Sequence, residues 1–278
     1  MANVPAVLDD EKGRLVASQA IAHAVGGFGP RLVAAHLIGS LAHEGFVAAV
    51  SDVDVALILD GQEPSDRARV EEINRRVAER DRSPLAQRLS VFWTTIASLR
   101  DGDPQGRLPA IDWLDLLDSG QLVHGATLQA DIPRPTGLQL VEDSATFAVS
   151  KWREDPDWAR HLLNSEALVS EGRRAASKAV LFPVRFLYTL ATGLAGGTHH
   201  AVDWYADQSQ APSRELVAAA YQWRVRGFDD EAVAARRLHQ QLVPLYHEFG
   251  NSYRRRLLDE GLERLAEALH ATIAQLGH

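Results

Sequence analysis

The first 125 residues alternate between short apolar runs, rich in β-branched and aromatic side chains, and longer stretches in which apolar residues recur every three to four positions. The short runs predict β-strands and the longer stretches predict amphipathic helices. The predicted strands cover residues 31–40, 51–60, 87–95 and 121–125. The predicted helices cover residues 9–26, 64–80 and 108–120. Such an order of elements favours a small mixed sheet flanked by helices.

Beyond residue 135 nearly every stretch has a helical period. The predicted helices there cover residues 139–153, 157–171, 172–193, 199–207, 213–224, 229–249 and 252–276. The segment ATLQADIPRPTG at 126–137 contains two prolines and a glycine, which is typical of a linker. We therefore predict an α+β protein with two domains. Residues 1–135 form a small mixed sheet flanked by helices, and residues 136–278 form an all-helical bundle.

Composition narrows the class of protein. The 278 residues are 46% hydrophobic and 24% charged, as in an ordinary soluble globular protein, and none is cysteine. Disulfides and thiolate metal sites are thereby excluded. No apolar run approaches the 18 residues of a membrane helix and no signal-peptide pattern is visible, so we expect a cytoplasmic protein without a membrane partner. The formal net charge of -8 argues against general nucleic-acid binding.

Two aspartates, Asp52 and Asp54, interrupt the apolar pattern of the predicted strand 51–60. Successive strand side chains point to opposite faces, so these two carboxylates point the same way. Like charges side by side cost energy, and a divalent cation would compensate for that cost. At the Gly39-Ser40 turn upstream, a glycine lets backbone amides approach phosphates and a serine adds a donor. Together these residues suit Mg²⁺-dependent nucleotidyl transfer.

This order of Gly-Ser, a gap and Asp-x-Asp on the next strand resembles the signature of the polymerase-beta-like nucleotidyltransferase superfamily. The resemblance implies that the first domain is a nucleotidyltransferase domain. It also implies that Gly39, Ser40 and Ser51 bind the nucleotide, and that Asp52 and Asp54 ligate two Mg²⁺ ions when nucleotide is bound. ATP is the co-substrate that it implies.

Residues 178–204, KAVLFPVRFLYTLATGLAGGTHHAVDW, are similar to a segment of aminoglycoside adenylyltransferases of the streptomycin/spectinomycin kind. In those proteins an Arg-x-x-Tyr helix ends in Thr-Gly, and an Ala-x-x-Trp helix follows. Independently of this likeness, Arg174, Lys178 and Arg185 fall on one stripe of the predicted helix. We expect Lys178 and Arg185 to bind the nucleotide across a cleft from the aspartate pair. A solvated stripe paired with Glu171 is the alternative.

The same helix contains Pro183, which should kink it and free the carbonyl of Ala179. Two histidine features, His36 on the first strand and the His199-His200 pair after a Gly-Gly loop, are expected to be structural. The tryptophans of the second domain are expected to lie mostly in its core.

The sequence departs from the superfamily pattern on the third predicted strand, where members carry a third acidic residue. The matching position here is Ser90, which can neither bind Mg²⁺ strongly nor act as a base at neutral pH. Three interpretations remain open. The base comes from elsewhere, with Asp112 and Asp115 the candidates although both are expected to be solvated; the acceptor is already an anion; or the protein binds nucleotide without turning it over.

From these observations we expect a Mg²⁺-dependent nucleotidyltransferase that moves AMP from ATP onto a small molecule, with aminoglycoside-like compounds among the candidates. The alternative is a catalytically weak member of the fold that acts as a nucleotide-binding or partner-binding module. Either form would be a monomer or a homodimer. The sequence does not specify the acceptor, because a fold is not a function.

Overall fold

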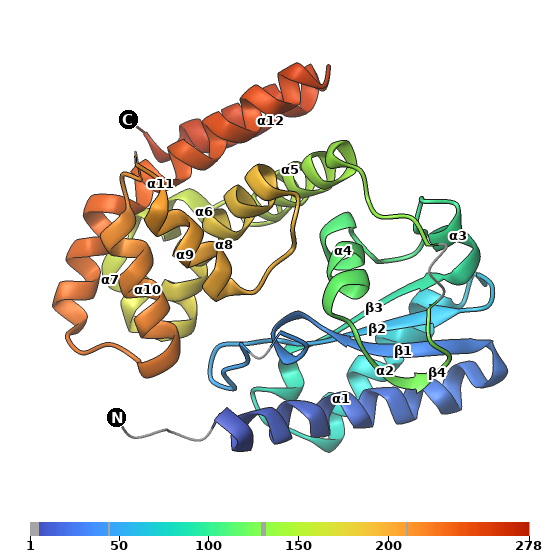
Figure 1. Ribbon diagram of the computed structural model, residues 1–278. Coiled ribbons are helices and arrows are strands. Elements are labelled where there is room, and N and C mark those ends of the chain that lie inside the picture. Colours follow the sequence, from blue (N-terminus) through green and yellow to red (C-terminus); the bar gives the residue numbers. More distant parts are fainter. Residues whose placement is uncertain (1–5, 44, 129–131, 210, 278) are drawn as a thin grey trace. The chain divides into compact units, whose positions relative to one another are not determined.

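The computed structural model describes residues 6–43, 45–128, 132–209 and 211–277 (Figure 1). By its internal contacts the chain divides into two compact units, Met1–Pro135 and Thr136–His278. The described part of the first unit contains a four-stranded sheet with helices, and that of the second unit contains helices without strands. This α+β organisation confirms the fold class that the sequence predicts.

The sheet of the first unit is small and mixed. Its strands are β1 (Leu32–Ile38), β2 (Val53–Leu59), β3 (Leu89–Thr95) and β4 (Gln121–Gly125). Their order is β3-β2-β1-β4, with β1 antiparallel to both neighbours and β2 parallel to β3. Each strand lies within or at the predicted apolar run. The central strands are buried along nearly their whole length because helices cover both faces of the sheet.

The two faces of the sheet are covered by different helices (Figure 1). Odd-numbered residues of β2, such as Val55 and Leu57, share a core with α1 (Ala6–Phe28) and α2 (Asp66–Arg80). Even-numbered residues, such as Ala56 and Ile58, pack instead with Trp113 of α4 (Ala110–Ser119). Because side chains alternate along a strand, Asp54 belongs to the α4 face.

A short helix that the sequence analysis does not predict, α3 (Ile96–Arg100), directly follows β3. Thr95 begins it by accepting a hydrogen bond from the backbone amide of Ser98. Five residues are too few for a helical period to be visible, so the cap is the only local signal. Leu99 joins the core on the α4 face.

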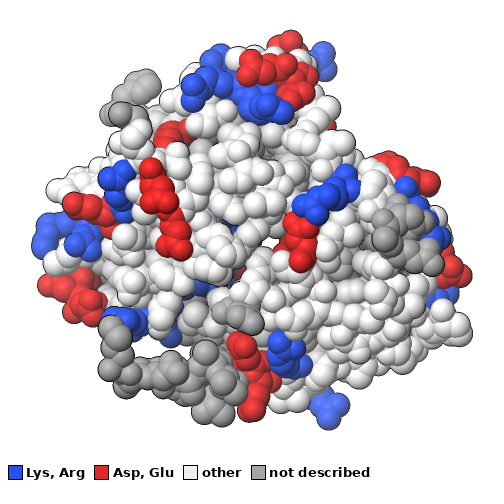
Figure 2. All heavy atoms as spheres, in the orientation of Figure 1, with Lys and Arg blue, Asp and Glu red and all other residues white. Residues whose placement is uncertain are grey.

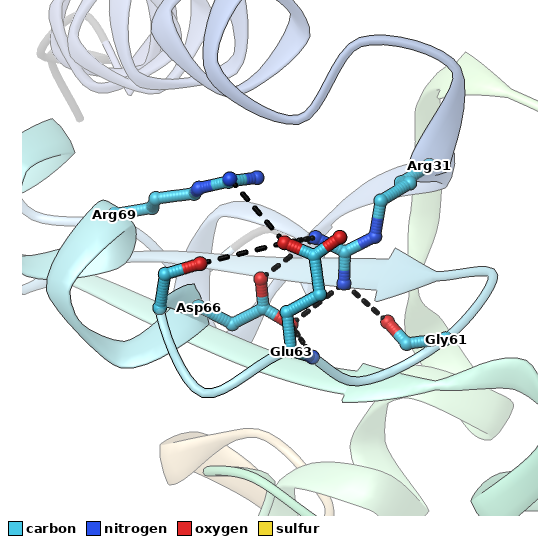
Figure 3. Close-up of polar contacts among 6 residues, drawn as sticks. Arg31, Gly61, Glu63, Asp66 and Arg69 are labelled. Carbon is cyan, nitrogen blue, oxygen red and sulfur yellow. Dashed lines mark hydrogen bonds and ion pairs between the residues drawn. The ribbon is translucent and has the colours of Figure 1, made fainter.

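A buried ion pair fixes the beginning of β1 (Figure 3). Asp66, at the start of α2, has no exposed surface and accepts hydrogen bonds from Arg31 Nη1 at 2.9 Å and Nη2 at 2.8 Å. The backbone amide of Glu63 donates a third at 2.8 Å. Arg31 also donates to the Gly61 carbonyl and contacts the Glu63 carboxylate. A buried carboxylate needs such partners, and this one has them on both oxygens.

The second unit is a helical bundle around one hydrophobic core. Its helices are α5 (Gly137–Glu154), α6 (Trp158–Leu163), α7 (Ser165–Ser170), α8 (Arg173–Thr192), α9 (Thr198–Asp207), α10 (Arg214–Arg226), α11 (Glu231–Asp259) and α12 (Glu263–Ile273). The core includes Trp152, Trp158 and Trp223, and Trp204 packs against it, as the sequence analysis expects.

Two predicted helix boundaries in this unit are wrong. The segment 157–171 is two helices, because the Asn164 side chain accepts a hydrogen bond from the Ala167 amide and starts a new one. Conversely, α11 continues through Gly250, where a helix end was expected. A Cβ at Gly250 would lie 2.9 Å from Ile273 Cγ1, so this glycine permits close packing of α12 against α11 and does not stop the helix.

In α8, the Ala179 carbonyl, which Pro183 deprives of a helical donor, accepts a hydrogen bond from a side chain of α11. Proline has no amide hydrogen, so the carbonyl of Ala179 lacks its usual helical donor. Tyr246 of α11 donates its hydroxyl to this oxygen at 3.0 Å. The proline and the tyrosine together join the two helices by a hydrogen bond inside the core.

The surface carries charges of both signs. Figure 2 shows one face, on which Lys and Arg mostly lie beside Asp and Glu. On α2, for example, Arg75 contacts both Glu72 and Glu79. Exposed pairs of this kind stabilise a protein only slightly. Within the described residues, no helix combines the length and the apolar character that crossing a bilayer requires.

Candidate functional site

The candidate site is centred on Gly39, which directly follows β1 and begins a 3-10 turn, η2 (Gly39–Leu41). Its φ of +66° lies in the left-handed region, where side chains are disfavoured. A Cβ at this position would lie 2.5 Å from Asp54 Oδ2. Glycine is therefore required here twice, for the backbone conformation and for the approach of the Asp54 carboxylate.

Strand pairing fixes the position of Asp54. Within the sheet it is paired with Ile38 of β1 on one side and with Ser90 of β3 on the other. Paired residues of neighbouring strands point to the same face, so Ser90 lies beside Asp54 as the sequence analysis supposes. Asp52 stands two residues earlier, just before β2, and both carboxylates are half-buried.

The two serines proposed as nucleotide contacts differ in exposure. Ser40 is half-buried in the η2 turn, and its carbonyl accepts a hydrogen bond from the Gly45 amide at 3.1 Å. Ser51 is only 3% exposed, and its hydroxyl accepts from the Val47 amide at 3.0 Å. Ser51 therefore closes the loop that leads into β2, and its contact with the nucleotide stays a prediction.

Asp115 of α4 corrects an expectation. The sequence analysis treats it as a solvated helix residue, but it is only 6% exposed. Its Oδ2 accepts a hydrogen bond from the Gly39 amide at 2.6 Å, and its Oδ1 lies 2.6 Å from Nε2 of His43. Asp112, one turn earlier on α4, is half-buried. The Gly39 amide therefore occupies Oδ2 of Asp115, and a function of Asp112 or Asp115 as the base stays a prediction.

His43 is a site residue that sequence reasoning missed. Its side chain is 8% exposed, as is that of Asp115, and its backbone amide donates to the Gly39 carbonyl at 3.2 Å. The sequence does place His43 only three residues after Ser40, in the same loop, and this proximity could have marked it as a candidate. Its partner lies 72 positions further along the chain, where no local pattern could reveal it.

The cationic stripe of the second unit lies on α8. Arg174 and Lys178 are half-buried and Arg185 is exposed, while Val184 and Leu187 enter the core as expected. The stripe therefore exists as a feature of the helix surface. A contact of Lys178 or Arg185 with the nucleotide stays a prediction.

Two of the histidines that the sequence analysis expects to be structural, His200 and His36, have structural positions. His200 lies in the first turn of α9, where its Nδ1 accepts a hydrogen bond from the Gly197 amide at 3.2 Å. His36 points to the α4 face of the sheet and is 4% exposed. Burial lowers the pKa of His36 to about 4, because a charged imidazolium would lose its hydration there.

The donor set at Asp52 and Asp54 fits Mg²⁺ bound together with a nucleotide. Among the described residues there is no group of three or more His, Cys, Asp or Glu side chains that could enclose a metal. Mg²⁺ does not need such a cage, since it commonly takes one or two carboxylates and completes its shell with water and substrate phosphates. The half-buried carboxylates of Asp52 and Asp54 supply the one or two protein ligands that this requires.

Comparison with solved structures identifies a protein of similar fold. No family model matches the chain, and no curated protein matches it significantly. Among solved structures it is similar to the spectinomycin adenyltransferase AAD(9) from Enterococcus faecialis, which was crystallised with ATP and spectinomycin. The TM-score is 0.53 at 12% sequence identity, and the match covers 82% of this chain and 98% of that one. The chain therefore has the fold of a nucleotidyltransferase.

Proposed function

We propose that this protein is a Mg²⁺-dependent nucleotidyltransferase that moves AMP from ATP onto a small-molecule acceptor. The observation that carries the proposal is the approach of the Asp54 carboxylate to the side-chain-free face of Gly39. The likeness in fold to an adenyltransferase solved with ATP and spectinomycin supports the same class of reaction. It also makes spectinomycin and other aminoglycoside-like compounds the first acceptors to test.

Each residue of the candidate site has a stated task in this proposal. The turn at Gly39 and the hydroxyl of Ser40 bind the phosphate chain; because the Gly39 amide already donates to Asp115, the glycine contributes by keeping the turn free of a side chain. Asp52 and Asp54 hold Mg²⁺, and the pairing of β2 fixes the direction of the Asp54 carboxylate. Bound there, Mg²⁺ supplies charge neutralisation for the α-phosphate and the leaving pyrophosphate. Lys178 and Arg185 add positive charge toward the triphosphate.

A second candidate function is nucleotide binding without turnover. The observation that favours it is the pairing of Ser90 with Asp54, because it puts a hydroxyl where the superfamily has its third carboxylate. A missing general base slows a transfer by a factor of about 10²–10⁴. A protein that had lost this group could still bind ATP and respond to it.

Release of pyrophosphate separates the two candidates. The protein is incubated with ATP and Mg²⁺, with and without each member of an acceptor panel that includes spectinomycin, streptomycin and an anionic sugar phosphate. The transferase proposal predicts acceptor-dependent pyrophosphate and an adenylylated acceptor detected by mass spectrometry. Asp52→Asn and Asp54→Asn should abolish both signals, while Asp60→Asn, an exposed carboxylate at the other end of β2, should not.

ATP binding without pyrophosphate from any acceptor would favour the binding module. Failure of the parent protein to bind ATP in Mg²⁺ would contradict both candidate functions. Activity that persists in Asp54→Asn would mean that the metal site lies elsewhere.

A further inference from the structure

The backbone of Arg107 is held along the outer edge of β3. The Arg107 amide donates a hydrogen bond to the Trp93 carbonyl at 2.9 Å, and the Trp93 amide donates to the Arg107 carbonyl at 3.0 Å. Gly106, the preceding residue, has a φ of +96°, and a Cβ there would lie 2.7 Å from the Trp93 carbonyl oxygen. The glycine therefore lets the chain come close to β3 and gives Arg107 a fixed place beside the strand.

The side chain of Arg107 runs back along β3 toward Ser90. From a backbone at the level of Trp93, its Nη1 reaches the Val91 carbonyl and donates a hydrogen bond at 3.2 Å. Its guanidinium carbon lies 4.8 Å from the centre of the Phe92 ring. Phe92 packs against the core on the α4 face of the sheet, so the guanidinium lies on that face too.

The same face carries the candidate site. Asp54 is paired with Ser90 of β3, and Phe92 is the next residue of β3 that points the same way. Because β3 has β2 on its other side, Arg107 is two strand spacings from Asp54, which is about 10 Å measured across the sheet. An acceptor group and the α-phosphate of ATP, placed side by side, can occupy a span of this length.

The charge of Arg107 is available to a ligand. Other arginines of the first unit, such as Arg31, Arg75 and Arg134, contact carboxylates. In the part of the chain that the structure describes, Arg107 is exposed and has no carboxylate within ion-pair distance. The bond to Val91 uses one of its five N–H groups. The planar fork of a guanidinium matches two oxygens of a phosphate or a carboxylate.

An anionic acceptor would also account for Ser90. A hydroxyl acceptor needs a base to take its proton, and Ser90, in the place beside Asp54, cannot act as one at neutral pH. A phosphate or carboxylate oxygen has already lost its proton at neutral pH and can attack without a base. Such an acceptor needs a cation that holds it beside the charged triphosphate, and Arg107 supplies one.

We propose that the acceptor is an anion, a phosphate monoester or a carboxylate, and that Arg107 binds it above the ring of Phe92; this inference rests on the proposed function. One oxygen of the anion accepts a hydrogen bond from Arg107, and another forms a bond to the α-phosphorus of ATP. The bond from that phosphorus to the bridging oxygen breaks, and pyrophosphate leaves with the electron pair. No proton has to be removed from the acceptor.

Pyrophosphate release with matched acceptors tests the proposal. Glucose 1-phosphate and glucuronate are the anionic probes, glucose is their neutral counterpart, and spectinomycin is a cationic one. The parent protein should turn over an anionic probe and neither of the other two. Arg107→Gln should raise the KM for that anion by about 10- to 100-fold, the effect of losing a hydrogen bond to a charged group, while the KM for ATP changes less than about threefold.

Three further variants define the contribution of the guanidinium. Arg107→Lys keeps the charge without the planar fork and should raise the acceptor KM by less than Arg107→Gln does. Phe92→Leu removes the ring below the guanidinium, and as a change in a positioning residue it should raise the acceptor KM without changing the KM for ATP. Arg80→Gln, at an exposed arginine that ends α2 on the other face of the sheet, should behave as the parent. Thermal melts show that each variant is folded.

Ser90→Asp separates the inference from a weak hydroxyl transferase. A new carboxylate beside Asp54 would repel an anionic acceptor, so turnover of the anion should fall. For a hydroxyl acceptor the same carboxylate would supply the missing base, and turnover would rise. A rise in turnover with glucose or spectinomycin would therefore contradict the inference.

Three other results would overturn it. Turnover of glucose or spectinomycin but of neither anion would do so and leave the proposed function standing, as would an acceptor KM that is equal in Arg107→Gln and the parent. Equal losses of affinity for ATP and for the acceptor would make Arg107 a triphosphate contact instead. Pyrophosphate from none of the acceptors would contradict the proposed function, and this inference with it.

Discussion

Two buried aspartates lie at opposite ends of β1 and are held in different ways. Asp66 receives the guanidinium of Arg31, which precedes the strand, and has no exposed surface. Asp115 receives the amide of Gly39, which follows the strand, and the ring of His43. The first aspartate faces a cation that cannot lose its proton. The second faces an imidazole ring, which when neutral is a donor on one nitrogen and an acceptor on the other.

The difference separates a cluster that stabilises the fold from a cluster that lies at the candidate site. Burial alone would raise the pKa of Asp66, but its hydrogen bonds with Arg31 and the Glu63 amide, and the charges of Arg31 and Arg69, together lower that pKa below its ordinary value. Asp66 therefore stays ionised and locks the loop between β2 and α2. At the other end, Asp115 accepts the Gly39 amide and lies against the ring of His43. The same strand thus anchors the fold at one end and presents the candidate site at the other.

The largest effect on stability should come from breaking the Asp66 cluster. Arg31→Met removes the cation and leaves a fully buried carboxylate, which should lower the free energy of unfolding by about 3–5 kcal/mol. Urea denaturation measures this. Arg67→Met, which breaks the exposed Arg67–Glu71 pair, should change it by less than about 1 kcal/mol. Equal effects of the two substitutions would mean that Asp66 is not a buried charge.

As the pH falls, protonation of His36, midway along β1, should lower the free energy of unfolding at a higher pH than protonation of Asp66 does. The pKa of His36 is lowered from 6.5 to about 4, so between these pH values the unfolded chain binds a proton that the folded protein does not. The free energy of unfolding should therefore fall as the pH falls through this window, by about 3 kcal/mol at pH 4. Asp66, whose pKa is also lowered, adds its loss only below its ordinary value of 3.8.

Denaturation midpoints measured from pH 7 to pH 4 test this order. His36→Leu should flatten the curve above pH 4, and His124→Gln should leave it unchanged. A flat curve in the parent protein would contradict the buried, neutral state of His36.

In the helical unit, two carbonyls that accept a tyrosine hydroxyl differ in whether they also accept a helical amide. Tyr246→Phe leaves the Ala179 carbonyl without a donor, because Pro183 supplies none, and should cost about 1–3 kcal/mol. Tyr253→Phe removes a similar bond to the Phe186 carbonyl, which keeps its helical amide, and should cost about 1 kcal/mol or less. Thermal melts of both variants decide this. A larger cost for Tyr253→Phe would contradict it.

Two glycines with positive φ flank β1 and sharpen the comparison at its ends. Gly29 has a φ of +56° with open space at its Cβ position, whereas Gly39 has a φ of +66° with Asp54 Oδ2 at 2.5 Å. Each alanine variant should lose about 1 kcal/mol of stability through its backbone conformation. Only Gly39→Ala should also weaken ATP binding, by tenfold or more, because the new methyl group displaces the carboxylate. Parallel losses of affinity in both variants would indicate a general disturbance of β1.

Much of the first unit could be predicted from local patterns. The strands follow from alternating and β-branched runs, and the pairing of Ser90 with Asp54 follows from aligning two apolar strands of similar length. The turn at Gly39 is recognisable in the sequence as a Gly-Ser pair after an apolar run, since turns with a positive φ favour glycine. These features depend on neighbours in the chain or in the adjacent strand, which is the range over which sequence patterns act.

The features that could not be predicted depend on distant contacts. Asp115 meets Gly39 across 76 positions, so the burial of one helical aspartate between leucines leaves no local trace. Gly250 has the composition of a helix end, yet it lies inside α11 because Ile273 packs against it. In both cases tertiary packing overrides the local signal.

The most direct test of the central claim is calorimetric titration of ATP into the parent protein and Asp54→Asn, each with Mg²⁺ and with EDTA. If Gly39, Asp52 and Asp54 form a metal–nucleotide site, the parent should bind ATP in Mg²⁺ and lose at least tenfold in affinity in EDTA. Asp54→Asn should bind weakly in both conditions, while Asp60→Asn behaves as the parent. ATP binding of equal strength in all of these conditions would contradict the account.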